Sequence, residues 1–328
     1  MRVHVLGRGL AGAWMAHWCA ERGVEVTIVD PFPQLNASRV AAGLINPTTG
    51  TRPKSTWRSE VLLPFAHEAY RQAELKYQAT FWTPRTIRRL FLTQKDADLW
   101  AAAVERGPGV EWQPLAPGHY DGVHYPFGGV AYQGATVDTN AFIDAVSAHN
   151  DTTTASPMDV DLTVWATGWQ ASHHDLWSWL PFQPVKGEIL DVVHEGEPLS
   201  AVVIRGIWII PGPLDQRQQV LRIGSTHDWD DLTNTPTATA RETLLAKAEE
   251  ILHRPLTVVG QQAAVRPAAQ SKRPFVGIHP EHRQHAILNG LGAKGSLWAP
   301  WAATQLLDHV MYGAPIDAEV DIQRWWQA

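Results

Sequence analysis

The first thirty residues alternate between apolar and polar segments in the order expected of a strand, a helix and a second strand. The apolar run Val3–Leu6 predicts a short buried strand, and Glu25–Val29 predicts another. Between them, Ala13–Arg22 has the length and composition of a helix, which Gly23 ends. We therefore expect residues 3–29 to form a βαβ unit, which is typical of a parallel sheet.

The middle of the chain keeps a mixed pattern of helices and strands. Residues 56–80 carry apolar side chains at near-helical spacing, and Thr139–His149 predicts a shorter helix. Residues 85–93 and the Gly- and Pro-punctuated stretch 107–135 predict strands and turns. Leu162–Trp165 predicts a buried strand.

The pattern changes after this strand, because apolar runs then follow one another with only turn residues between them. These runs predict an antiparallel sheet with one amphipathic helix, at about Ala238–His253. The four predicted strands are Val185–Val193, Ala201–Pro211, Gln219–Ser225 and Gln261–Arg266. A strand at His285–Asn289, a second glycine-rich turn and a helix at Leu297–Val310 come last. The predicted fold class is α/β, with a Rossmann-like parallel sheet and an antiparallel sheet beside it.

The turn after the first strand contains the glycine spacing of a dinucleotide-binding site. Gly7 permits a tight turn, Gly9 lets the backbone approach a pyrophosphate, and Gly12 lets the helix pack closely on the strand. The free amides at the start of the following helix attract phosphate groups. Asp30, at the end of the second strand, can accept hydrogen bonds from ribose hydroxyls and would repel the 2′-phosphate of NADP.

Composition narrows the class of protein. The 328 residues suffice for two domains, and the net charge of −6 without a long basic run argues against nucleic-acid binding. No apolar run approaches the roughly 20 residues of a membrane span, and the first residues form a strand rather than a signal peptide. The single cysteine, Cys19, is expected to be a buried thiol, and the histidine spacing predicts no metal site. We expect a cytoplasmic protein.

Motifs along nearly the whole chain resemble the D-amino-acid oxidase family of FAD-dependent oxidoreductases, especially its glycine oxidase and D-amino-acid dehydrogenase branches. Their order matters, because a nicotinamide dehydrogenase would not need a second glycine turn near its C-terminal end. The motifs are residues 7–12 with Asp30, residues 41–44, 165–168, 184–188, 208–211, 265–267, Arg273-Pro274 with Gly277, and residues 290–300.

The resemblance implies non-covalently bound FAD and two discontinuous domains. Residues 1–50, 134–172 and 267–328 would bind FAD, and residues 51–133 and 173–266 would form the substrate domain. Ser38 would contact the pyrophosphate, and residues 42–44 would lie beside the reactive nitrogen of the flavin. The implied cofactor-binding residues are Gly7, Gly9, Leu10, Ala11, Gly12, Asp30, Ser38, Ala42, Gly43, Leu44, Ala166, Thr167, Gly168, Gly290, Gly292, Ala293, Lys294 and Gly295.

Three residues are candidates for the catalytic site. Arg266 stands where the family places the arginine that holds the substrate carboxylate, and a guanidinium suits that task because it binds a carboxylate bidentately. Trp208 stands at the position of an active-site aromatic residue. Lys294 stands where glycine oxidases have an arginine. The positive charge is kept, but as a point charge rather than a planar guanidinium. We expect the Lys294 side chain in the pocket rather than in solvent.

Two segments leave alternatives open. Arg52, Lys54, Trp57 and Arg58 either make the pocket strongly cationic, which would favour a substrate with more than one acidic group, or are solvated charges at a helix start. Residues 150–161 form a short, polar segment where the family has a fuller strand. The way in which the adenine is bound is therefore left open.

The leading function is oxidation of the C–N bond of a small amino or imino acid by hydride transfer to FAD. The electron acceptor, oxygen or a quinone, is open. One alternative is a flavin module that acts on a modified tRNA uridine, which the acidic charge balance disfavours. Another is a non-catalytic flavin-binding redox sensor.

Overall fold

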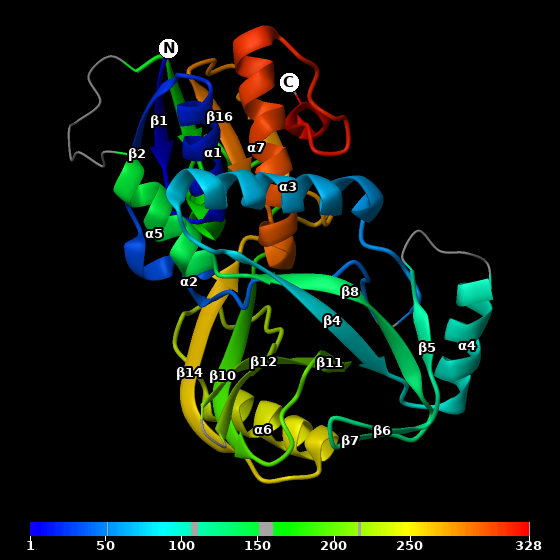
Figure 1. Cartoon of the computed structure of the whole chain (residues 1–328). Helices are drawn as coiled ribbons and strands as arrows, with labels where there is room; N and C mark the ends of the chain where they lie inside the picture. Colours follow the sequence, from blue (N-terminus) through cyan, green and yellow to red (C-terminus); the bar gives the residue numbers. More distant parts are fainter. Residues whose placement is uncertain (51, 106–110, 151–159, 216–217, 328) are drawn as a thin grey trace.

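The computed structural model describes residues 1–50, 52–105, 111–150, 160–215 and 218–327. Two sheets organise these residues, and Figure 1 shows the first sheet with its helices above the second. The first sheet has five strands in the order β15-β16-β9-β1-β2. Their bounds are β1 (Arg2–Leu6), β2 (Glu25–Val29), β9 (Leu162–Trp165), β15 (Phe275–Ile278) and β16 (His285–Asn289).

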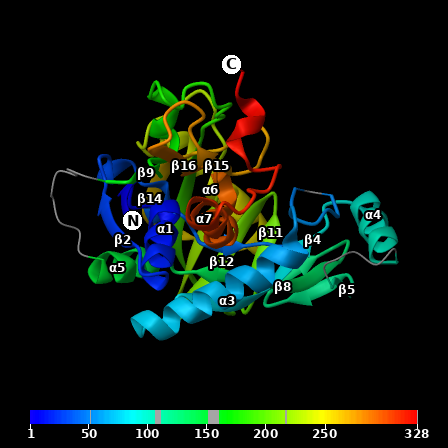
Figure 2. The same ribbon diagram turned by 90° about the horizontal axis from the view of Figure 1, so that it is seen from above.

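The first sheet is parallel except at one edge. β1 pairs in parallel with β2 and β9, β9 pairs in parallel with β16, and β15 joins β16 in the antiparallel sense. Its strands carry apolar side chains because two helices, α1 (Leu10–Glu21) and α7 (Gly295–Tyr312), pack against them. Helix α3 (Ser59–Tyr77) packs on α7, and α5 (Thr139–His149) packs on α1. Figure 2 shows α7 end-on, with α1 beside it and α3 lying across.

Aromatic residues fill the core between these helices. Trp14 on α1 is fully buried, stacks on Phe142 of α5 with 4.6 Å between ring centroids, and meets Tyr70 of α3 edge-on at 4.9 Å. Cys19 lies in the same core, where burial raises the pKa of its thiol to about 12. The thiol therefore stays protonated and acts as a small apolar side chain.

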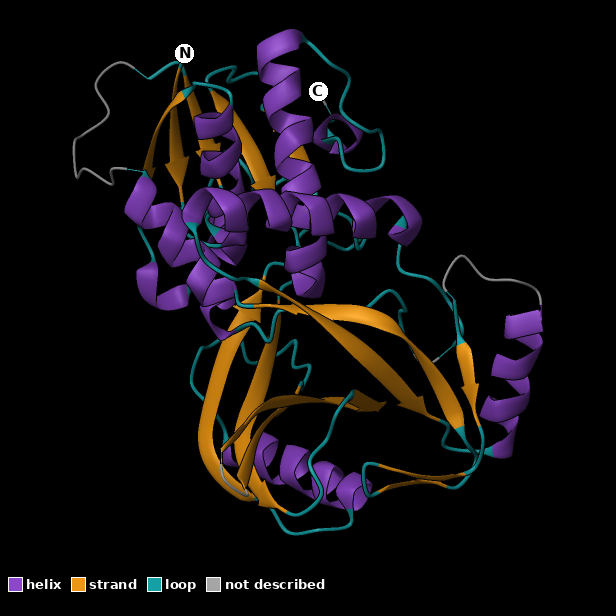
Figure 3. Ribbon diagram, in the orientation of Figure 1, coloured by secondary structure: helices purple, strands orange, loops and turns teal. Residues whose placement is uncertain are grey.

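The second sheet has nine strands and curls beneath the first, as Figure 3 shows. Its order is β14-β10-β13-β12-β11-β4-β8-β3, with β5 paired to β8. The strands are β3 (Leu44–Ile45), β4 (Trp82–Leu90), β5 (Gln113–Leu115), β8 (Gly129–Val137), β10 (Val185–Glu195), β11 (Val202–Arg205), β12 (Ile207–Asp215), β13 (Gln218–Gly224) and β14 (Thr257–Arg266). A separate hairpin pairs β6 (Gly118–Tyr120) with β7 (Val123–Tyr125).

The two faces of the second sheet pack against different partners. Ile209 and Ile223 belong to a buried cluster with Leu244 of α6 (Ala238–Leu252). On the other face, Ile204 belongs to a cluster with Trp100 of α4 (Gln94–Glu105). Trp208, which lines the pocket described below, belongs to this second face.

The structure confirms most of the predicted elements and corrects several. The predicted antiparallel sheet over residues 185–266 is confirmed, because β10 to β14 pair in the antiparallel sense. β4 extends this sheet by pairing with β11 in parallel. The predicted strand Ala201–Pro211 is instead two strands, β11 and β12, which pair with each other. The last helix begins at Gly295, two residues before the predicted Leu297, because a short 3-10 turn runs directly into it. The small-residue segment after Asp30 contains a short helix, α2 (Ala37–Val40), which the Asn36 side chain caps.

The proposed domain boundaries stay a prediction. The boundary at residue 134 falls within β8, a strand of the second sheet. The way in which the adenine is bound depends on the segment 150–161, and most of this segment lies outside the described residues. Among the helices that the structure describes, none combines the length and apolar character that a membrane crossing requires.

Candidate functional site

A pocket is lined by residues from both sheets. Its walls come from the carboxyl ends of β1 and β9 in the first sheet and from β10, β12 and β14 in the second. Helix α2 and the turn before α7 complete them. The carboxyl ends of parallel strands are where open α/β sheets bind ligands.

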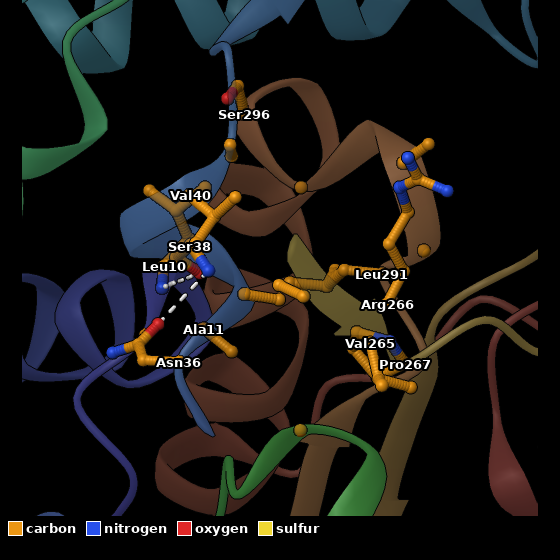
Figure 4. Close-up of a pocket in the computed structure, with 18 of the residues that line it drawn as sticks. Leu10, Ala11, Asn36, Ser38, Val40, Val265, Arg266, Pro267, Leu291 and Ser296 are labelled. Atoms are coloured by element: carbon orange, nitrogen blue, oxygen red, sulfur yellow. Dashed lines mark hydrogen bonds between the residues drawn. The ribbon is translucent and has the colours of Figure 1, made fainter. Parts of the chain in front are cut away.

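Most of the predicted site residues meet at this pocket. Of that set, Gly12, Gly290 and Lys294 do not line it, and the other seventeen do: Gly7, Gly9, Leu10, Ala11, Asp30, Ser38, Ala42, Gly43, Leu44, Ala166, Thr167, Gly168, Trp208, Arg266, Gly292, Ala293 and Gly295. Lining residues that the sequence did not single out include Asn36, Gly187, Ser225 and Ser296. Figure 4 shows Leu10, Asn36 and Ser38 across the pocket from Arg266.

The glycines of the first turn are required by close backbone contacts. Gly7 has a φ of +109°, and a Cβ there would lie 2.3 Å from the carbonyl oxygen of Ala166. A Cβ on Gly12 would lie 1.9 Å from the carbonyl oxygen of Gly7, so Gly12 allows α1 to pack on the turn without lining the pocket. Gly9 precedes α1, and its open Cα position faces the Ser38 hydroxyl. This cradle of backbone at a helix start fits a pyrophosphate.

Ser38 is tied to this turn by hydrogen bonds. Its Oγ accepts a hydrogen bond from the backbone N–H of Leu10 at 3.0 Å, and its own N–H donates to Asn36 Oδ1. The Asn36 amide donates to the carbonyl oxygen of Arg8. Asn36 is thus a positioning residue that sequence reasoning missed, although an Asn before a short helix is a recognisable capping signal.

Asp30 lies at the end of β2, where the pocket begins. Its carboxylate accepts hydrogen bonds from the backbone N–H groups of Arg8, at 3.3 Å, and Phe32, at 3.1 Å. These bonds orient the side chain at the pocket wall and leave it lone pairs, so it could accept further hydrogen bonds from a ribose.

Backbone also lines the opposite end of the pocket. Gly43 has a φ of +65°, and a Cβ there would lie 1.9 Å from the carbonyl oxygen of Val137, so no other residue fits. Gly292 and Ala293 form the 3-10 turn that leads into α7, and Gly290 before it has a φ of +71°. The backbone at Gly43 and the backbone of the turn at Gly292 and Ala293 carry small or no side chains, so a flat ring fits between these two segments.

Arg266 ends β14 and brings a cation to the pocket wall. Its guanidinium lies over Gly187, where an added Cβ would be 1.7 Å from Nη2. Both Nη atoms donate only long hydrogen bonds, of 3.4 Å, to the carbonyl oxygen of Thr226. Burial lowers the pKa of Arg266 to about 10, so it stays charged at neutral pH. Within the described ranges, no acidic side chain forms an ion pair with it.

Trp208 reaches the same pocket from β12. It pairs with Gly224 of the neighbouring strand, and a Cβ on Gly224 would lie 2.7 Å from the indole Cζ2. The edge of the indole therefore lies next to the Gly224 backbone, and Trp208 lines the pocket with an apolar surface.

Lys294 is half-buried and lies between Ala293 and Gly295, which line the pocket. Its Nζ donates hydrogen bonds to the carbonyl oxygen of Asn46 at 3.0 Å and to Thr56 Oγ1 at 3.1 Å. Burial, and then the nearby charge of Arg89, lower the pKa of the Lys294 ammonium to about 8. The lysine thus neither lines the pocket in this structure nor extends into solvent.

Of the two alternatives for residues 52–58, the structure favours charges at a helix start over a cationic pocket. Arg58 forms ion pairs with Asp317 and, at 3.2 Å, with Glu319, and the Trp57 indole also donates to Glu319. Arg52 and Lys54 are exposed, and none of these residues lines the pocket. The C-terminal acids that neutralise Arg58 are more than 250 positions away, so sequence alone gave no sign of the pairing.

A known family has this arrangement of sheets and glycine turns. A family model described as FAD dependent oxidoreductase matches residues 2–308. The chain belongs to this family. The glycine cradle and the backbone-lined pocket fit FAD, the cofactor of this family.

Relatives of this FAD-dependent oxidoreductase fall into two groups. A tRNA 5-methylaminomethyl-2-thiouridine biosynthesis bifunctional protein from Marinobacter nauticus is 24% identical over 94% of this chain and 55% of its own length. Glycine oxidase from Pseudomonas putida is 35% identical over 41% of this chain and 36% of its own length. The chain thus spans about half the length of the bifunctional relative.

Solved structures share the fold over almost the full chain. Iminodiacetate oxidase from Chelativorans sp. BNC1 superposes with a TM-score of 0.79 at 19% identity, covering 97% of each chain. Glycine oxidase from Bacillus cereus superposes with a TM-score of 0.77 at 20% identity, covering 96% of each chain. At this identity the likeness establishes the fold.

Proposed function

We propose that the chain oxidises the carbon–nitrogen bond of a small amino or imino acid. The observation that supports this most is Arg266, a charged guanidinium at the pocket wall that forms no ion pair within the described ranges. A half-buried cation without an internal anion is costly for the fold and is available to bind a carboxylate of a ligand.

The proposed reaction removes two electrons from the substrate. The Cα–H leaves as a hydride, the nitrogen lone pair forms a C=N bond, and the nitrogen loses a proton to water. Bound FAD supplies the hydride acceptor. Water then adds to the imine carbon and releases an amine and a carbonyl product. The substrate nitrogen must be neutral at the moment of transfer, and no protein base is obligatory.

Each candidate residue takes one role in this proposal. Arg266 binds the substrate carboxylate bidentately and so fixes the Cα–H towards the cofactor, and Trp208 covers the substrate and excludes water. Lys294 contributes a point charge near this end of the pocket. Gly7, Gly9, Ser38 and Asp30 would hold the adenosine and pyrophosphate of FAD. The turns at residues 42–44 and 290–295 would flank its ring.

The bifunctional tRNA-modification relatives support a second candidate, which is action at the amine of a modified uridine. Their match extends over 94% of this chain, whereas the glycine oxidase match covers 41%. A net charge of −6 disfavours it, since RNA binding depends on contacts with phosphates.

Anaerobic bleaching of the flavin tests these candidates together. The FAD-replete protein is mixed with glycine and with D-, L-, N-methyl and N-carboxymethyl amino acids, and separately with the modified nucleoside free and within RNA. Bleaching by a free amino acid supports the proposal. Bleaching by the RNA alone would support the second candidate, and no bleaching by any amine would indicate a flavin-binding redox sensor.

A further inference from the structure

Arg89 lies on the pocket side of the second sheet, two strands from Trp208. Ile204 of β11 pairs with Arg89 of β4 on one side and with Trp208 of β12 on the other. Residues directly opposite each other in a sheet project from the same face. Arg89 therefore shares the face of Trp208, while Arg266 reaches the pocket from β14, at the other end of the strand order.

The guanidinium of Arg89 has few partners for a buried cation. The residue is 8% exposed, and its Nε is buried without a hydrogen-bond partner in the described part of the chain. Nη2 donates one long hydrogen bond, of 3.5 Å, to Thr48 Oγ1, and the Cζ atom lies 5.5 Å from the centre of the Trp100 ring. No acidic side chain within the described ranges forms an ion pair with Arg89.

The next residue along the chain shows what an ordinary structural arginine does here. Arg88 projects from the opposite face of β4 and forms an ion pair with Asp121 at 2.7 Å. Charged groups are almost never fully buried unless they are paired. The charge of Arg88 is compensated by Asp121. The buried charge of Arg89 has no such partner among the described residues, and this needs an explanation.

Lys294 approaches Arg89 from the other side of the same loop. Residues 46–56 are closed by a bridge between Thr48 and Ser55, and Thr48 contacts Arg89 while Asn46 accepts from Lys294. Lys294 uses two of its three donors within the described structure, which leaves one for a ligand. The charge of Arg89 lowers the pKa of Lys294, so the two cations repel each other, and an anion bound by both would remove that cost.

We propose that Arg89 and Lys294 form a second anion site, so that the substrate is an amino or imino acid with a second carboxylate. This inference rests on the proposed function, in which Arg266 holds the first carboxylate. The second carboxylate belongs to the substituent on nitrogen or to the side chain. A cationic pocket, which was one of the two alternatives for residues 52–58, is thus assigned instead to residues on β4 and before α7.

A binding experiment tests this site without requiring turnover. Malonate, succinate and glutarate are titrated into the holoenzyme at pH 7 and followed by the flavin spectrum, each against its monoamide. The two members of a pair have the same size and differ by one charge. We expect at least one diacid to bind about tenfold or more tightly than its monoamide, as a charged hydrogen bond predicts.

Variants then assign the preference to Arg89. The ratio of the two dissociation constants should fall to near one in Arg89→Gln, persist in part in Arg89→Lys, and stay at the wild-type value in Arg88→Gln. A ratio near one in the wild type for all three pairs would overturn the second site, and so would a preference that survives in Arg89→Gln. The wild-type ratio keeps the test decisive even if a variant does not fold.

The proposed function fails by a different result. If diacids bind through Arg89 but no amine bleaches the flavin, the anion site stands and the C–N oxidation is wrong. If amino acids bleach the flavin but the diacid preference is absent, the oxidation stands and the second site is wrong.

Discussion

Arg89, Arg266 and Lys294 form no ion pair with an acidic side chain among the described residues. Lys186 shows the contrast, since it is 1% exposed and forms ion pairs with Glu188 and Asp231. A folded chain tolerates buried charge when a partner or a ligand compensates it. At the scale of single residues, the missing anions therefore support the proposal that an acidic ligand binds beside these three side chains.

The affinity for a carboxylate should depend on pH through Lys294. Its pKa is lowered to about 8, so the charge is present below that pH and is lost above it. We expect the dissociation constant of a carboxylate that lacks an amine to rise between pH 7 and pH 9, measured by flavin absorbance. Lys294→Met should bind weakly at both pH values. A wild-type pH dependence that persists in Lys294→Met would remove the lysine from the site.

Asp30 should contribute to FAD affinity. Replacing it with Ala removes a charge-assisted hydrogen bond to ribose of about 1.5–3 kcal/mol, which weakens FAD binding on the order of tenfold or more. The measurement is reconstitution of the apoprotein with FAD, followed by flavin fluorescence. Glu25→Ala, at the exposed start of the same strand, is the control and should bind like the wild type. Equal affinities for both variants would leave Asp30 without a role.

At the scale of elements, the pairing of β10 with β14 places Arg266. Gly187 on β10 lies beneath the guanidinium, and its missing side chain leaves the space that Arg266 occupies. The register of two strands, rather than one residue, thus aims the cation into the pocket.

Gly187→Ala should therefore disturb Arg266 without touching its charge. The new methyl group would displace the guanidinium, and carboxylate affinity should fall on the order of tenfold or more. The control is Gly260→Ala on β14, where the nearest atom would be at an ordinary 3.4 Å. In an Arg266→Met background, Gly187→Ala should add no further loss. A full additional loss there would show that the two residues act independently.

The elements themselves could largely be predicted from the sequence, because their signals are local. The helical composition and Gly23 placed α1, and the apolar runs between turn residues placed β10, β13 and β14. β11 and β12 were predicted as one strand, Ala201–Pro211. The parallel pairing of β11 with β4 could not be predicted, since the two strands are more than 100 residues apart and nothing local fixes the partner. Arg89 was also missed. The stretch Arg85 to Arg89 has the pattern of an exposed strand, and nothing local shows that Arg89 is buried.

At the scale of the whole molecule, the pocket joins the two sheets, so its ligand should stabilise both. A ligand that binds only the folded state at 100 times its dissociation constant adds about 2.7 kcal/mol. Excess FAD should therefore raise the Tm of the apoprotein by several degrees in a single transition. A scan in which only one of two transitions moves would show that the sheets unfold separately.

The cofactor should leave the protein without proteolysis. The proposed contacts are hydrogen bonds and backbone packing, so heat or acid should release yellow FAD into the supernatant. Flavin that stays with the precipitated chain would show a covalent bond and contradict this account.

The central claim is that Arg266 binds a substrate carboxylate for oxidation at carbon. The most direct measurement compares wild-type protein, Arg266→Met and Arg222→Met by the rate of anaerobic flavin reduction across the amino-acid panel. Arg222 is the control because it belongs to the same sheet and is ion-paired with Asp191 at 2.9 Å. We predict a loss of catalytic efficiency of about 10- to 100-fold or more in Arg266→Met alone, from roughly 1.5–3 kcal/mol. Equal efficiency in all three proteins would contradict the account.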